Sequence, residues 1–122
     1  MPHDWIWLKT LTLPQCPNGE YPGPETCVDP IYNGYADAYK ADHEYFAGLT
    51  HDAQLNYQIQ VGHALDVFYL TGDCAALANT VNALHTQTAA DIADWYAQEN
   101  QSFMQNLLAM RADLLANCCG NE

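Results

Sequence analysis

Residues 64–84, ALDVFYLTGDCAALANTVNAL, decide the fold of this chain, because they contain its clearest helix stop followed by a helix start. Gly72 is the residue type that commonly follows a helix end, and Asp73 is a preferred N-cap for the next helix. Residues 64–70 are apolar nearly all round, which places them at the centre of the expected core. After the turn, Leu77, Val81 and Leu84 mark one helix face. The stretch predicts two antiparallel helices joined by a tight turn.

Before this turn, the sequence predicts two helices separated at Gly48. The first runs from about Asn33 or Tyr35 to Ala47. Thr50 is a suitable N-cap for the second, which continues to about Leu70. Its apolar face comprises Leu55, Ile59, Leu65 and Tyr69.

After the turn, the apolar spacing continues to Asn117 and leaves two alternatives open. Thr88 and Asp91 resemble a capping box, which predicts a break near Gln87. Without that break, residues 73–117 form one helix of about 65–70 Å. The last apolar face comprises Ile92, Tyr96, Phe103, Leu107, Met110 and Leu114. The predicted fold class is mainly α, an antiparallel bundle of three to four helices with an extended, Pro-rich and disulfide-looped N-terminal arm.

The N-terminal arm, residues 1–34, differs in composition from the predicted helical bundle, residues 35–122. All six prolines lie within the first thirty residues. Leu11-Thr12-Leu13 alternates as in a short extended strand. The apolar side chains of the arm need a surface to cover them, on this chain or on a neighbour, and these expected interface residues are Trp5, Ile6, Trp7, Leu8, Leu11 and Leu13.

Five cysteines are many for a chain of 122 residues, and they favour disulfides and an extracytoplasmic or particle-associated location. Cys16 and Cys27 flank a loop rich in turn formers, which predicts a bridge between them. Cys74, at a helix start, can meet Cys118 or Cys119 at the end of the last helix in an antiparallel arrangement. One cysteine is then left free or pairs between subunits.

The charge of the chain excludes direct nucleic-acid binding. The chain has fifteen acidic residues and three basic ones, and the resulting net charge of −12 repels nucleic acid and anionic membrane surfaces. No stretch reaches the roughly 20 apolar residues that span a bilayer, so no membrane insertion is expected.

No cofactor motif or arranged catalytic group stands out. His63 and Asp66 can share a helix face, and His43 lies among carboxylates, so these three are weak candidates for metal ligands. The chain lacks the Glu-x-x-His pairs of carboxylate-bridged metal sites in helical bundles. We therefore expect no metal site, no cofactor and no catalytic residue.

The sequence leads to a hypothesis of a non-enzymatic structural subunit. In this reading, a virus or phage particle or an extracellular filament forms as the arm docks on identical or other structural subunits. The alternative is an extracytoplasmic, disulfide-stapled helical binding module for a small ligand, a metal or a partner protein, of an immunity or inhibitor type. An enzyme is a third class without a positioned catalytic group to support it.

Overall fold

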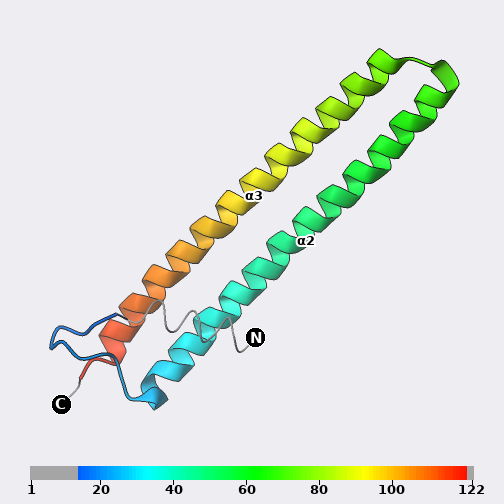
Figure 1. Cartoon of the computed structure of the whole chain (residues 1–122). Helices are drawn as coiled ribbons and strands as arrows, with labels where there is room; N and C mark the ends of the chain where they lie inside the picture. The colour runs from blue at the N-terminus through cyan, green and yellow to red at the C-terminus, as the bar shows by residue number, and fades with distance from the viewer. Residues whose placement is uncertain (1–13, 121–122) are drawn as a thin grey trace. The chain divides into compact units, whose positions relative to one another are not determined.

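A computed structural model describes residues 14–120, which are mainly helical (Figure 1). Two long helices pack together: α2 spans Glu25–Thr71 and α3 spans Cys74–Asn117. No strand occurs among the described residues. The chain divides into two units, each containing a segment of both helices. We call residues up to His43 and from Asn100 onward the clasp unit, and Glu44–Glu99 the tip unit.

The turn between the helices confirms the predicted stop at Gly72 and start at Asp73. Gly72 has a φ of 68°, in the left-handed region that favours glycine, and its N–H donates to the carbonyl of Phe68 at 2.7 Å. The carboxylate of Asp73 accepts a hydrogen bond of 3.0 Å from the N–H of Ala76, as an N-cap does. Local sequence therefore determines the position of this turn.

The predicted breaks at Gly48 and near Gln87 are wrong, since α2 and α3 are continuous there. A glycine inside a helix costs only about 1 kcal/mol relative to alanine, which is too little to end a long helix by itself. Near Gln87, the side chain of Gln87 donates a 2.9 Å hydrogen bond to the carboxylate of Asp91. Asp91 therefore makes a helical i, i+4 contact instead of taking part in a capping box. The described residues thus form two helices where the sequence predicts three or four.

Helix α2 also begins earlier than the sequence predicts, at Glu25 instead of Asn33 or Tyr35. The N–H groups of Cys27 and Val28 both reach the carbonyl of Pro24, at 2.9 and 3.0 Å. Pro30 lies inside the helix and lacks the N–H for one main-chain bond. Two buried side chains, Val28 and Tyr32, lie on either side of it and offset that loss. The predicted boundary between residues 34 and 35 therefore falls inside α2.

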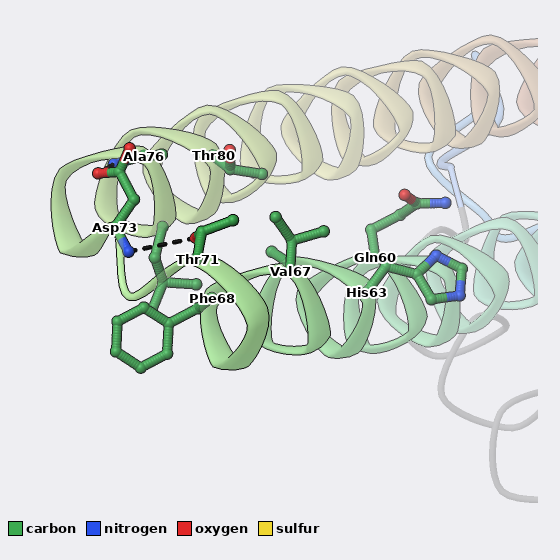
Figure 2. A pocket seen from close by; sticks show the side chains of 10 residues that line it. Gln60, His63, Val67, Phe68, Thr71, Asp73, Ala76 and Thr80 are labelled. Atoms are coloured by element: carbon green, nitrogen blue, oxygen red, sulfur yellow. Dashed lines mark hydrogen bonds between the residues drawn. The ribbon is translucent and has the colours of Figure 1, made fainter.

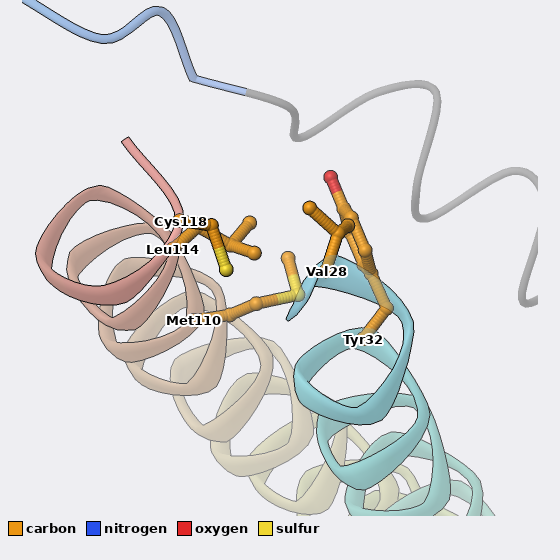
Figure 3. Close-up of a cluster of buried hydrophobic side chains, with 5 residues drawn as sticks. All are labelled: Val28, Tyr32, Met110, Leu114 and Cys118. Atoms are coloured by element: carbon orange, nitrogen blue, oxygen red, sulfur yellow. The ribbon is translucent and has the colours of Figure 1, made fainter. Parts of the chain in front are cut away.

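The buried core lies in the clasp unit (Figure 3). It joins the first turns of α2 to the last turns of α3, and its members are Val28, Tyr32, Met110, Leu114 and Cys118. The tip unit has no comparably buried side chain. Residues 64–70, which the sequence places in the core centre, are instead mostly exposed, with Val67 at 57 % and Leu70 at 88 %. The reason is geometric: within this unit a helix has only one neighbour, which covers one stripe and leaves the other faces open.

Candidate functional site

Two disulfides join the start of the described chain to the end of α3, and we call them the clasp. Cys16 bonds to Cys119 and Cys27 to Cys118, with Cα–Cα distances of 5.5 and 5.8 Å. The predicted Cys16–Cys27 bridge is therefore wrong. Cys27 lies in the first turn of α2, and antiparallel packing brings the end of α3 beside that turn.

Cys74 is the free, exposed cysteine, so the predicted bridge from Cys74 to Cys118 or Cys119 is also wrong. It begins α3 at the opposite end of that helix from Cys118. The clasp uses the other four cysteines, as two pairs between distant segments. The prediction of disulfides with one cysteine left over agrees with this pairing, whereas the predicted partners do not.

The loop between Pro14 and Pro24 is fixed by main-chain hydrogen bonds as well as by the clasp. The N–H of Cys16 donates to the carbonyl of Glu20 at 2.8 Å, and the N–H of Gly23 donates to the carbonyl of Cys118 at 2.8 Å. A hollow of about 380 Å³ borders this loop, lined by Cys16, Asn18, Glu20, Tyr21, Gly23, Pro24, Cys118 and Gly120. Both cysteines in the lining are oxidised, so the hollow offers no thiolate nucleophile.

Polar contacts join α2 to α3 within the clasp unit. The phenol of Tyr35 donates a 2.6 Å hydrogen bond to the carboxylate of Asp113. That hydrogen bond raises the pKa of Tyr35, and burial and the negative charge of Asp113 add to the shift in the same direction. Ser102 donates a hydrogen bond to Asp42 further along the two helices. These contacts hold the register between the helices.

A mostly apolar hollow of about 250 Å³ lies in the tip unit (Figure 2). Its lining comprises Gln60, His63, Ala64, Val67, Phe68, Thr71, Asp73, Ala76, Leu77 and Thr80. The hydroxyl of Thr71 accepts a 3.2 Å hydrogen bond from the N–H of Asp73 at its edge. Apolar walls with a few polar groups suit an apolar ligand or side chain better than an ion.

The three weak metal candidates do not converge on one point. His63 borders the tip hollow, and Asp66, one turn later on α2, is exposed like it. His43, also exposed, stacks on Tyr39 with ring centroids 6.1 Å apart. Across residues 14–120, no three His, Cys, Asp or Glu side chains gather as metal ligands. Neither α2 nor α3 contains a segment long and apolar enough to cross a membrane.

The predicted interface residues of the arm lie outside the described residues: Trp5, Ile6, Trp7, Leu8, Leu11 and Leu13. Within the described chain, the sequence reasoning missed Val28 and Tyr32 as core residues. A signal for them was present, because they are four residues apart and match the spacing of Met110 and Leu114. The prolines around these residues indicate an extended arm, so the helical spacing of Val28 and Tyr32 does not stand out in the sequence.

The described site therefore consists of an oxidised clasp, a tip hollow and exposed apolar helix faces, without an arranged catalytic group. Comparison of the chain with protein-family models, with curated proteins and with solved structures found no match.

Proposed function

We propose that this protein is a non-enzymatic structural subunit that associates with copies of itself, docking through its N-terminal arm. One observation carries the proposal: the tip unit buries no side chain fully, yet exposes several large apolar ones. They are Tyr45, Leu55, Ile59, Leu65, Val67, Tyr69, Leu70 and Tyr96. Soluble monomers rarely leave so much apolar surface uncovered, whereas subunits of assemblies cover it with neighbours.

The distribution of charge supports the arm as the docking segment. Residues 1–13 contain one acid, Asp4, and one base, Lys9, so the remaining residues carry the whole net charge of −12. Two acidic bodies repel one another, and the charge-balanced first thirteen residues of the arm escape most of that repulsion. Its residues Trp5, Ile6, Trp7, Leu8, Leu11 and Leu13 would cover apolar surface of a neighbouring subunit.

The clasp supports an assembly outside the reducing cytosol, in a virus or phage particle or in an extracellular filament. Disulfides persist in oxidising compartments and on particle surfaces. In such an assembly, helices of neighbouring chains would pack together and cover the exposed apolar faces.

The test is absolute mass by light scattering after size-exclusion chromatography, at low and moderate salt. We expect the wild-type chain to exceed 13.6 kDa by a multiple, with more association at moderate salt because ions screen the acidic surface. The full chain carrying Trp5→Ala and Trp7→Ala should fall to a lower mass than the wild type while its helical circular dichroism persists. Tyr21→Ala, which removes a 60 % exposed aromatic that is not among the predicted interface residues of the arm, is the matched control and should not dissociate the assembly.

The alternative function, an extracytoplasmic binding module, is favoured by the tip hollow. Its volume and apolar lining suit a small apolar ligand or a partner side chain. A wild-type chain that stays monomeric in both salts would contradict the structural subunit. Thermal-shift screening of small apolar compounds would then test the module, since a ligand that binds the folded state raises the melting temperature. Val67→Asp should abolish that rise.

A further inference from the structure

One flank of α3 in the clasp unit carries exposed apolar side chains at helical spacing. Met104, Leu108 and Leu115 are 49 %, 61 % and 38 % exposed. They are separated by four and by seven residues, which places all three on the same side of an α-helix. We call them the α3 flank.

The α3 flank is rotated about the axis of α3 away from the side that packs on α2, towards the place where a bundle has another helix. Leu107 and Leu114, each one residue before a flank residue, pack in the cluster that contains Val28 and Tyr32 of α2. One residue along an α-helix turns the side chain by about 100°. In a four-helix bundle each helix contacts two neighbours about a quarter turn apart. The flank therefore faces the position that a second neighbour would take.

Most of the α3 flank, Met104 and Leu108, lies in a part of the chain without acidic residues. Residues 100–112 contain no Asp or Glu, and their one charged residue is Arg111. The next acid, Asp113, is exposed, and its carboxylate accepts the hydrogen bond from Tyr35 of α2. By contrast, Glu25, Asp29, Asp37 and Asp42 lie along α2 in the same unit.

We propose that the α3 flank binds the same flank of a second copy, helix α3 against helix α3. This contact is distinct from arm docking and needs no residue of the arm. The charge of the chain indicates the partner: two chains that each carry a net charge of −12 repel one another least where both have few carboxylates, as along residues 100–112. A basic partner would instead be drawn to the carboxylates along α2. A two-fold contact of this kind brings four helices from two chains together.

Cysteine cross-linking tests the contact in the full-length chain. In a Cys74→Ser background, which removes the free thiol, Leu108→Cys places one new thiol on the flank. Mild oxidation should then give a covalent dimer of twice 13.6 kDa. Asn33→Cys, exposed on α2 in the same unit, is the matched control and should remain uncross-linked. Equal cross-linking at both positions, or none at Leu108→Cys, overturns the proposal.

A charge substitution gives an independent readout that does not depend on thiols. Leu108→Glu should remove the dimer from light-scattering profiles, whereas Asn33→Glu, which adds the same charge on α2, should keep it. Circular dichroism of both variants shows whether the helices remain. Folded Leu108→Glu with the wild-type mass overturns the contact.

Combining these variants with Trp5→Ala and Trp7→Ala separates this inference from the proposed function. A wild-type mass that the arm substitutions leave unchanged and that falls with Leu108→Glu supports the flank and contradicts arm docking. A larger assembly that the arm substitutions reduce to a dimer, which is then lost with Leu108→Glu, supports both. An assembly lost with the arm substitutions but unchanged in Leu108→Glu overturns the flank and leaves arm docking supported. A wild-type monomer at moderate salt overturns both.

Discussion

The phenol oxygen of Tyr35 lies 2.6 Å from a carboxylate oxygen of Asp113, across 78 residues of sequence. The contact joins α2 to α3 in the clasp unit, near the buried cluster of Tyr32 and Met110. Neutral tyrosine donates to the carboxylate, whereas ionised tyrosine would repel it, which is why the pKa of Tyr35 is raised. The bond therefore stabilises the fold only while the phenol keeps its proton.

Tyr35→Phe should lower the free energy of unfolding by about 1 kcal/mol near neutral pH, the usual net value of such a hydrogen bond. Because the folded pKa lies above the ordinary value of about 10, the contribution is complete below pH 10 and is lost as the pH rises through the raised value. Urea unfolding from pH 7 to pH 11.5 measures this difference, with Tyr45→Phe as the exposed control. A difference that grows above pH 10 would contradict the sign of the shift.

Removing one disulfide of the clasp should lower the free energy of unfolding less than removing the second one afterwards. Each bridge closes a long loop, with separations of 103 and 91 residues that differ by 12. While one bridge remains, breaking the other opens only a small ring of about 12 residues, the difference between the two separations. On the chain-entropy model that loss is about 3 kcal/mol, whereas breaking the last bridge costs about 4.7 kcal/mol more.

Unfolding of Cys16→Ser/Cys119→Ser, of Cys27→Ser/Cys118→Ser and of the fourfold variant checks this order of effects. Cys118 is 1 % exposed, so its removal also tests packing in the core, and the Cys16/Cys119 pair is the cleaner comparison. A fourfold variant no less stable than either pair would contradict the loop argument.

Tryptic mapping without reductant should distinguish the observed pairing from a local Cys16–Cys27 bridge. Cleavage after Lys9, Lys40 and Arg111 puts Cys16 and Cys27 on one peptide, residues 10–40, and Cys118 and Cys119 on another, residues 112–122. The clasp predicts that these two peptides remain joined until a reductant is added. Native-state alkylation should label one thiol, on the peptide of residues 41–111 that contains Cys74. Separate peptides before reduction would exclude the clasp.

Two glycine substitutions in the tip unit should have opposite effects. Gly72→Ala should lower the free energy of unfolding by about 1 kcal/mol, because an L-residue is strained at a φ of 68°. Gly48→Ala should raise it by about 0.5–1 kcal/mol, since this helical glycine has open space around the added methyl group. Thermal unfolding followed by circular dichroism measures both. A stabilising Gly72→Ala would mean that the turn differs from the one described.

The features predicted well from sequence are those that depend on neighbouring residues. Gly72 and Asp73 fix their turn through hydrogen bonds within four residues, so the turn can be predicted from the residue types at these positions. Gly48 is also a residue type that can end a helix, but it costs a helix only about 1 kcal/mol, and α2 continues through it. The residue type alone therefore does not predict whether a helix stops.

The clasp was not predictable from spacing, because cysteine connectivity depends on where helices begin. Pro30 disfavours a helix at the position where α2 forms, and without that first turn of α2 the sequence predicts that Cys27 lies in a loop. Once Cys27 is on α2, its partner follows from the antiparallel packing of α3. The weak metal candidates show the same dependence, since His63 and Asp66 share a helix without a third ligand from another segment.

The nested bridges also change what a cut in the backbone does. Cys27 and Cys118 enclose nearly the whole of both helices, so the main chain between them and the disulfide together form a closed covalent ring. A single proteolytic cleavage anywhere in that ring opens it without releasing a fragment. A subunit nicked once at an exposed position would thus keep both halves attached until a reductant is added, and a second cut in the ring would release only the segment between the two cuts.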